Sequence, residues 1–338
     1  MLDFIETPAR PVPRIATTAT RRDVWGAIGA RLGIVRNRYR VAPGLYAAGS
    51  PGPDSAVLVT ANYKLSFDAL RFCLSQFNVW LLAVDTRGVN VWCAAGKGTF
   101  SSGEVIESVQ RSQLYQVVTH RQLILPQLAA PGVSAQMVQS GCGFSVLFGP
   151  VRAADVPAYL QQGYRCDERM REVTFSLGER AVLIPVELYL LVKPLVAVCA
   201  LMFVLSGIGP TWFSPAMAIQ RSVVFLTGTL VGLGCGSIAA PLLLPWLPGR
   251  QFWLKGLILG MMAALLPWVV GTPDLALTER LALSIWIVTI SSYLAMNFTG
   301  STPYTSPSGV EYEMRRGLPA QLIGCCVALV LWLASPFL

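Results

Sequence analysis

The sequence predicts a Rossmann-like α/β domain followed by an all-α transmembrane domain of about five helices. Hydrophobic residues make up 54% of the 338 residues and charged residues 13%, a balance too apolar for an ordinary soluble protein. Residues 1–180 carry 19 of the 26 basic and 13 of the 18 acidic side chains. We therefore divide the chain into an N-terminal arm and helix (1–50), an α/β domain (51–180) and a transmembrane domain (181–338).

The first 50 residues are rich in Pro, Arg and Thr, and they predict an extended arm without a signal peptide. A helix is expected from Asp23 to about Gly33, because Trp25, Ile28 and Leu32 recur on one helical face.

Strands alternate with helices after this arm, which is typical of a parallel sheet with crossover helices. The expected elements are a strand over 56–60, a helix over 66–77, a strand over 79–85, a helix from about 104 to 111, strands over 115–119 and 144–148, and a helix over 153–162. The helix near 104 begins with a capping box, Ser101-Ser102-Gly103-Glu104. We expect the sheet to end near residues 173–177.

Cys93 stands in the stretch Asn90-Val91-Trp92-Cys93-Ala94-Ala95-Gly96-Lys97, which we expect to be a loop between a strand and a helix. Ligands bind at such loops in α/β domains. The small residues Ala94, Ala95 and Gly96 would let a bulky group approach the backbone, and Lys97 would favour a thiolate. The alternative is that Cys93 is a buried small hydrophobe.

Residues 90–97 resemble the signature of the mercury-methylating corrinoid protein family (HgcA), whose soluble domain is similar to the corrinoid domain of the corrinoid iron–sulfur protein. A soluble domain before membrane helices is also that family's order. The resemblance implies a base-off cobalamin with no histidine below cobalt and with Cys93 as the catalytic residue and lower axial ligand. It also implies that the residues around Cys93 contact the cofactor, namely Asn90, Trp92, Ala94, Ala95, Gly96 and Lys97.

The segment Thr60-Ala61-Asn62-Tyr63-Lys64 follows the first strand of the α/β domain, so we expect it at the same sheet edge as Cys93. It is similar to a segment of the mercury-methylating family. Thr60 and Asn62 are therefore candidates for hydrogen bonds to the amide side chains of the corrin. The alternative is a turn that caps the following helix.

His120 is the only histidine. Cobalamin proteins that ligate cobalt through histidine use Asp-x-His-x-x-Gly, but Val118 and Leu123 replace the Asp and the Gly here. We expect His120 at a helix start or on the surface. The eight cysteines contain no Cys-x-x-Cys pair, so we expect no iron–sulfur cluster in this chain.

Five apolar runs are long enough to span a hydrocarbon core of ~30 Å. They cover residues 183–207, 218–244, 252–271, 277–297 and 318–337. The second run could instead be a helix broken at 232–236 and followed by a re-entrant piece. Gly228, Gly232 and Gly236 recur every four residues and predict a small-residue face for close helix packing.

The positive-inside rule places the α/β domain in the cytoplasm and the C-terminus outside the cytoplasmic membrane. The expected inner loops carry four basic residues and the outer loops two, which are Arg250, Lys255, Arg315 and Arg316 against Arg221 and Arg280. A further segment, 297–311, is expected to be a cytoplasmic loop rich in hydroxyl groups and punctuated by proline. It is similar to a segment of the mercury-methylating family, and a solvated linker is its alternative.

With the resemblance, the sequence indicates a membrane-anchored corrinoid methyltransferase that moves a methyl group from methylcobalamin to inorganic Hg(II), giving methylmercury. The implied partners are a small ferredoxin-like protein with two 4Fe–4S clusters (HgcB-like) and a folate-type methyl donor or its methyltransferase. The net charge of +8 suits an anionic lipid surface. No basic stripe with interleaved aromatic residues is present, so we exclude nucleic acid as a partner.

Two other functions stay open. The first is a corrinoid methyl carrier for a different acceptor in one-carbon metabolism. The second is a membrane transporter with a regulatory α/β domain and no corrinoid.

Overall fold

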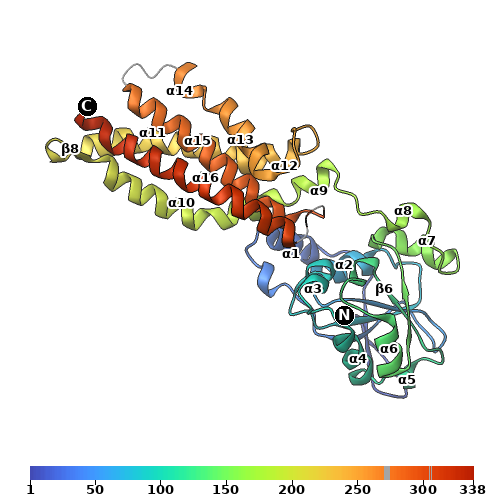
Figure 1. The fold of residues 1–338 in the computed structure, drawn as a ribbon. Helices are drawn as coiled ribbons and strands as arrows, with labels where there is room; N and C mark the ends of the chain where they lie inside the picture. Colours follow the sequence, from blue (N-terminus) through green and yellow to red (C-terminus); the bar gives the residue numbers. More distant parts are fainter. Residues whose placement is uncertain (270–274, 304, 306) are drawn as a thin grey trace. The chain divides into compact units, whose positions relative to one another are not determined.

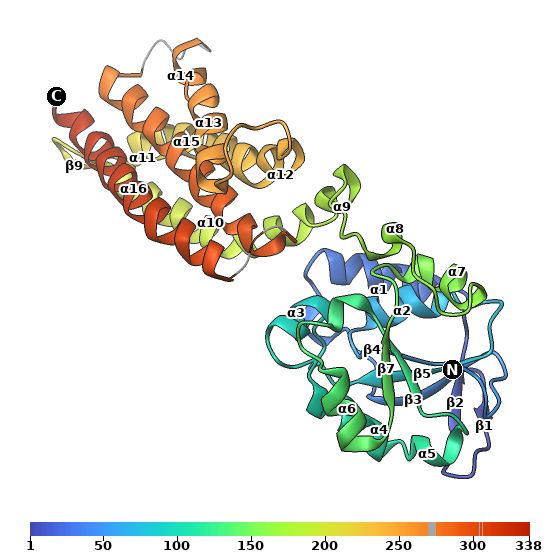
Figure 2. The ribbon, with the colours of Figure 1, turned by 45° about the vertical axis from the view of Figure 1, so that its right-hand side comes forward.

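The computed structural model describes residues 1–269, 275–303, 305 and 307–338. The chain forms two compact units, Met1–Thr174 and Phe175–Leu338. Figures 1 and 2 show the elements of both units in two views.

Unit 1 is built on a seven-stranded sheet in the order β1-β2-β3-β5-β4-β6-β7. The strands are β1 (Phe4–Ile5), β2 (Val12–Ile15), β3 (Gly44–Ala48), β4 (Val57–Ala61), β5 (Val79–Val84), β6 (Gln122–Leu125) and β7 (Ser145–Phe148). β4 pairs in parallel with both β5 and β6, and β6 pairs in parallel with β7. Every residue of β4 and β5 is buried, as a parallel strand covered on both faces requires.

The parallel strands β5-β4-β6-β7 have the order of a doubly wound fold. β4 is the first of these strands along the chain, and its two neighbours in the sheet are the second and the third. The chain therefore reverses its winding direction between β4 and β6. In open α/β sheets, ligands bind at the carboxyl ends of the strands next to such a switch point.

Two layers of helices cover the sheet, one on each face (Figure 2). α2 (Lys64–Phe72), α7 (Val156–Gln161) and α8 (Glu168–Arg171) pack on one face with Leu58 and Leu81. The other face, with Val59 and Leu82, packs against α3 (Val91–Gly96), α4 (Ser102–Arg111), α5 (Leu114–Val117) and α6 (Ala135–Cys142). Neighbouring residues of one strand thus enter different cores, because side chains alternate across a sheet.

The predicted α/β class is confirmed, and several predicted elements are confirmed with shifted ends. The expected strands 56–60, 79–85 and 144–148 are β4, β5 and β7. The expected helix near Glu104 is α4, and the hydroxyl of Ser101 accepts the backbone N–H of Glu104 at 3.4 Å. The expected helix over 153–162 consists of a 3₁₀ turn, Ala153–Asp155, followed by α7.

Three local predictions are wrong. Residues 115–119 form no strand, because Gln113 has a left-handed backbone (φ 50°) and starts the helical turn α5, which buries Leu114 and Val117. The strand lies later, at β6. The helix expected to reach residue 77 ends at Phe72, and the last strand of the sheet ends at Phe148 rather than near 173–177.

The first 50 residues contribute more than an arm and a helix. They contain α1 (Arg21–Arg31) within the expected region, together with the strands β1, β2 and β3. β2 pairs in parallel with β3, and β3 pairs antiparallel with β5. This part of the chain therefore completes one edge of the sheet.

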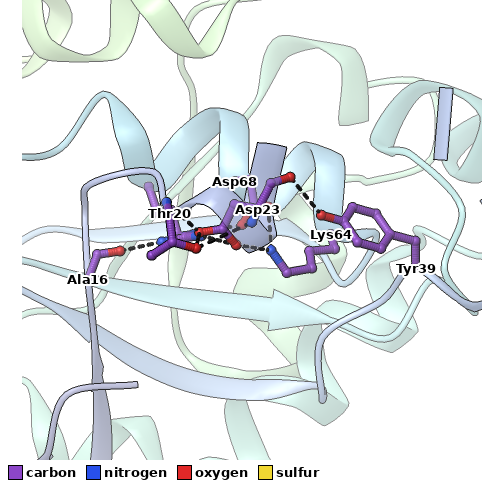
Figure 3. A network of polar contacts seen from close by, with 7 residues as sticks. Ala16, Thr20, Asp23, Tyr39, Lys64 and Asp68 are labelled. Carbon is purple, nitrogen blue, oxygen red and sulfur yellow. Dashed lines mark hydrogen bonds and ion pairs between the residues drawn. The ribbon is translucent and has the colours of Figure 1, made fainter. Parts of the chain in front are cut away.

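A network of ion pairs ties α1 to α2 (Figure 3). The Asp23 carboxylate contacts Lys64 Nζ at 2.7 Å and Arg71 Nη2 at 2.9 Å, and Asp68 also pairs with both cations. Burial opposes ionisation of Asp23, but hydrogen bonds from Lys64, Thr20 and Arg71 outweigh it and lower its pKa. Burial likewise opposes the charge of Lys64, and its hydrogen bonds to Asp23 and Asp68 raise the pKa above the usual value.

Unit 2 is helical. Its helices are α9 (Leu177–Ala181), α10 (Ile184–Ser206), α11 (Pro215–Leu233), α12 (Ala240–Leu243), α13 (Phe252–Ala263), α14 (Leu266–Val269), α15 (Leu277–Asn297) and α16 (Pro307–Ala334). A small hairpin, β8 (Ile208–Gly209) and β9 (Trp212–Phe213), joins α10 to α11. α15 lies among α11, α13 and α16 (Figure 1). Among the described residues, five helices are long and apolar enough to cross a membrane.

The glycine face predicted on the second span packs against α15. A Cβ at Gly228, Gly232 or Gly236 would lie 3.1 Å or less from an atom of α15, at Leu283, Ile287 and Ser291 respectively. The span is not broken at these glycines. α11 continues through a π-helical segment, Gly234–Ala239, into α12, so the alternative of a re-entrant piece is not supported.

The segment 297–311 is mostly helical, contrary to the expected loop. Phe298–Ser301 forms a 3₁₀ turn after α15, and α16 begins at Pro307. Thr302 is buried, and its hydroxyl lies 3.0 Å from that of Thr305. Tyr304 and Ser306, which belong to the same predicted loop, lie outside the described residues.

Candidate functional site

Cys93 belongs to the short helix α3 rather than to the expected loop. Asn90 is the residue that starts this helix, and its side-chain oxygen accepts the backbone N–H of Cys93 at 2.8 Å. An asparagine is favoured at this position because its side chain satisfies one of the free N–H groups of the first turn. Cys93 itself is half-buried. Asn90 therefore holds the backbone of Cys93, which is three positions later in the sequence.

Asn62 holds the turn that leads into α3. Its side chain is 1% exposed and lies at the end of β4. Its Oδ1 accepts the backbone N–H groups of Thr86 at 3.1 Å and Gly88 at 3.0 Å, and its Nδ2 donates to Asp85 Oδ1 at 3.0 Å. Arg87 and Gly88 both have a left-handed backbone, with φ of 59° and 76°. Asn62 therefore stabilises a strained turn between β5 and Asn90, and its expected contact with a cofactor stays a prediction.

A cavity of about 310 Å³ opens at the carboxyl ends of the parallel strands. Thr60 from β4 lines it, together with Asn90, Val91 and Trp92 from the start of α3. The wall also includes the end of β6, the segments that follow β6 and β7, and one side of α2. These parts contribute Leu125, Pro126, Gly149, Pro150, Ser66 and Ala69. The cavity thus lies at the switch point between β4 and β6.

The other residues of the octet occupy two different environments. Ala94 and Ala95 are buried. Ala95 packs closely against Gly132, because a Cβ added at Gly132 would lie 3.0 Å from the Ala95 Cα. Their small size serves this packing within the protein. Gly96 and Lys97 are exposed at the end of α3, and a Cβ at Gly96 would meet nothing within 4 Å.

The structure therefore brings Thr60, Asn90 and Trp92 together around one cavity. Cys93 directly follows Trp92 on α3. Asn62, Ala94 and Ala95 support the site from within the core, whereas Gly96 and Lys97 face solvent.

His120 lies at the opposite edge of the sheet. It precedes β6, so it is at the amino end of the parallel strands, in a turn rather than at a helix start. One ring nitrogen lies 2.9 Å from the carbonyl oxygen of Ser55. The position of His120 makes it unavailable to a group bound at the carboxyl edge.

Burial raises the pKa of three other thiols of unit 1, those of Cys73, Cys142 and Cys166. Desolvation disfavours the thiolate form, so a smaller fraction of these thiols is ionised at neutral pH than of an exposed cysteine.

Sequence reasoning missed the cavity residues that follow the last two strands, Pro126, Gly149 and Pro150. A signal was present, since proline and glycine after an apolar run mark the end of a strand. This signal could not be used at Pro126, because the strand that precedes Pro126 had been placed at 115–119. Ser66 was correctly assigned to a helix. The face of that helix that meets the cavity could not be predicted, because the strand that is β6 had been placed at 115–119.

Comparison with known proteins relates this domain to subunits of a large complex. Residues 35–160 match the family described as CO dehydrogenase/acetyl-CoA synthase delta subunit. The gamma subunit of the acetyl-CoA decarbonylase/synthase complex from Archaeoglobus fulgidus is 30% identical over 131 residues, which is 38% of this chain and 27% of that subunit. The gamma subunit from Methanopyrus kandleri is 32% identical over 129 residues, which is 38% of this chain and 28% of that subunit.

The chain thus spans about a quarter of the length of these curated relatives. The matched region contains β3 to β7, both sides of the cavity and the whole octet around Cys93. These similarities support a corrinoid-protein domain in the N-terminal unit, and they leave the mercury-methylating family as a finer hypothesis.

Proposed function

We propose that unit 1 binds a corrinoid at the carboxyl edge of its sheet with Cys93 as the protein ligand of cobalt, and that the protein transfers a methyl group to Hg(II). The observation that carries this proposal is the position of Cys93. Cys93 is half-buried, its backbone N–H is held by Asn90, and it directly follows Asn90, Val91 and Trp92, which line the cavity at the switch point of the sheet. The similarity of residues 35–160 to corrinoid-protein subunits supports the corrinoid part of this proposal.

The donor set fits a corrinoid better than a bare metal ion. The described residues contain no group of three His, Cys, Asp or Glu side chains that could hold an ion. A corrin would already supply four nitrogen ligands to cobalt, so one ligand from the protein would suffice. Cys93 could provide that one ligand, and Gly96 on the same helix is exposed and has no neighbouring atom, among the described residues, that would block a large group.

The residues around Cys93 have defined tasks in this proposal. Asn90 fixes the backbone of Cys93, and Asn62 fixes the turn before it. Thr60 lines the cavity and would hydrogen-bond an amide of the corrin. Trp92 would cover an apolar part of the ring. A bound corrinoid supplies a cobalt-carried methyl group, and a thiolate ligand donates more electron density than imidazole, which favours departure of that group to an electrophile such as Hg(II).

The helices of unit 2 would anchor this activity in the cytoplasmic membrane with unit 1 inside. Two of the residues used to orient the chain, Arg221 and Lys255, are buried within helices. Arg280, Arg315 and Arg316 also belong to helices, α15 and α16, rather than to the expected loops. The exposed inner residues Arg250, Arg315 and Arg316 still outnumber Arg280 on the outer side, so the predicted orientation is retained. The electron donor would be a ferredoxin-like protein with two 4Fe–4S clusters, and the methyl group would come from a folate-type donor.

A second function shares the corrinoid but not the acceptor. The curated relatives are subunits of acetyl-CoA decarbonylase/synthase complexes, which favours a methyl carrier in one-carbon metabolism. In that case the site around Cys93 would be unchanged, and another electrophile would take the place of Hg(II).

The test uses the purified full-length protein. We expect bound cobalt and a visible spectrum that differs from that of free base-on cobalamin. Cys93→Ala should change this spectrum and abolish methyl transfer to Hg(II) at matched expression. Cys142→Ala is the matched control, because it removes another half-buried thiol of unit 1 and should leave both readouts unchanged.

The outcomes separate the hypotheses. Near-normal methyl transfer in Cys93→Ala would refute the role of the cysteine. Bound corrinoid without transfer to Hg(II) in the wild type would favour the second function. Absence of cobalt and of any cobalamin binding would favour a transporter with a regulatory domain.

A further inference from the structure

We infer that unit 2 contains a binding site for a phosphate group, carried by an anionic lipid headgroup or supplied as a free phosphate. The site is a pocket of about 500 Å³ formed entirely within the helical unit. Its walls come from α9 and the residue Phe175 before it, the segment between α12 and α13, the start of α13 and the segment between α15 and α16. The lining residues are Phe175, Arg180, Leu244, Pro245, Gly249, Arg250, Phe252, Lys255 and Thr305.

Three of the lining residues are cations. Arg180 and Lys255 are 5% and 8% exposed, whereas Arg250 is exposed. Burying two cations in one small volume is costly unless counter-charges are near. An anion in the pocket would lie among three positive side chains, which is the arrangement that phosphate groups favour.

Arg180 is incompletely paired in a way that points to a ligand. Its Nη1 donates to the Phe175 carbonyl at 3.1 Å, but its buried Nε has no hydrogen-bond partner among the described residues. A buried guanidinium N–H without an acceptor destabilises the protein, because it has lost its hydrogen bond to water. An oxygen atom of a bound phosphate would satisfy it.

The carboxylate of Glu313 is a counter-charge for Lys255, but it is not a hydrogen-bond acceptor for the Nε of Arg180. Glu313 accepts the backbone N–H groups of Phe252 at 2.9 Å and Trp253 at 3.2 Å, so its oxygens are engaged at the start of α13. Lys255 donates to the Leu244 carbonyl at 2.6 Å, which positions its ammonium group on the pocket wall.

The surroundings suit a lipid headgroup in particular. The pocket is far larger than a bare ion needs, since one water molecule occupies about 30 Å³ of the liquid. Large exposed apolar side chains stand next in sequence to the lining residues, including Leu177, Leu243 and Trp246. In the membrane placement proposed above, such side chains would contact acyl chains.

The experiment measures binding to the full-length protein after removal of lipid in detergent. Phosphatidylglycerol, phosphatidylcholine and inorganic phosphate are added separately, and the readouts are thermal stabilisation and native mass spectrometry. The variants are Arg180→Gln and Arg250→Gln. The control is Arg315→Gln, which removes an equal charge from an exposed residue of α16 that pairs with Glu311 at 2.7 Å.

We expect phosphatidylglycerol to bind, and each pocket variant to bind it about tenfold more weakly, a loss of about 1.4 kcal/mol. Arg315→Gln should bind like the wild type. If Arg180→Gln fails to fold, Arg250→Gln decides, because Arg250 is exposed.

Competition by inorganic phosphate at similar occupancy would identify free phosphate as the ligand, and binding of phosphatidylglycerol alone would identify the lipid. Equal binding of phosphatidylcholine and phosphatidylglycerol, no binding of any probe, or equal losses in Arg315→Gln would overturn the site. None of these results depends on Cys93, so failure of the site and failure of the proposed function are distinguishable.

Discussion

Replacing Asn62 by alanine should loosen the turn that positions Cys93. Asn62 is buried at the end of β4 and contacts three successive parts of the segment before α3, through Asp85, Thr86 and Gly88. Alanine fits the space but offers no hydrogen bond. The turn contains two left-handed residues, so it depends on these contacts to keep its conformation.

The magnitude follows from the bonds that are lost. The Thr86 hydroxyl has one proton and also lies 2.6 Å from the Val89 carbonyl, so its contact with Asn62 is left out of the sum. Three bonds remain, and at about 1 kcal/mol each the substitution should cost about 3 kcal/mol. This corresponds to roughly a hundredfold increase in the local opening equilibrium.

Hydrogen–deuterium exchange of the full-length protein measures this opening directly. Amides of residues 86–93 should lose about two orders of magnitude of protection, while those of β6 change little. Asn62→Asp is the matched variant, because it keeps the accepting oxygens but faces Asp85 with a carboxylate; its loss of protection should grow as the pH rises and this carboxyl group ionises. Less than a threefold change in Asn62→Ala would refute this account of the turn.

Three further predictions test other parts of the molecule. Thr60→Ala should weaken cobalamin binding by about 1–3 kcal/mol in a spectroscopic titration, and an unchanged affinity would remove Thr60 from the site. The stability that Asp23 contributes to the α1–α2 contact should be present above its ordinary pKa of 3.8 and lost as the pH falls below it, whereas that of Lys64 should be present below 10.5 and lost above it. Exchange of α1 amides, corrected for the intrinsic rate at each pH, measures both losses, and a pH-independent protection would contradict them. Ser308→Cys should react with a membrane-impermeant thiol reagent only after cells are opened, and labelling in intact cells would overturn the orientation.

Local sequence patterns determined the class of the fold and most of its central elements. The buried strands β4 and β5 could be read from continuous apolar runs, and the start of α4 from Ser101 and Glu104. The glycine face of the second span was also predictable. Small residues spaced four apart lie on one face of a helix and predict close packing against another helix, although they do not identify that helix. The octet around Cys93 follows β5, so its place at the carboxyl edge of the sheet was also predictable.

Only the tertiary structure decided what the residues of that octet do. Sequence reasoning took Ala94 and Ala95 as space for a ligand, but both are buried and Ala95 packs against Gly132, which is distant along the chain. The same holds for Asn62, which hydrogen-bonds a turn more than twenty residues later. The spacing of residues along one helix or strand is fixed by local geometry, so a pattern can reveal it. Contacts between segments depend on how the whole sheet is ordered, and the misplaced strand before Pro126 hid the cavity until that order was known.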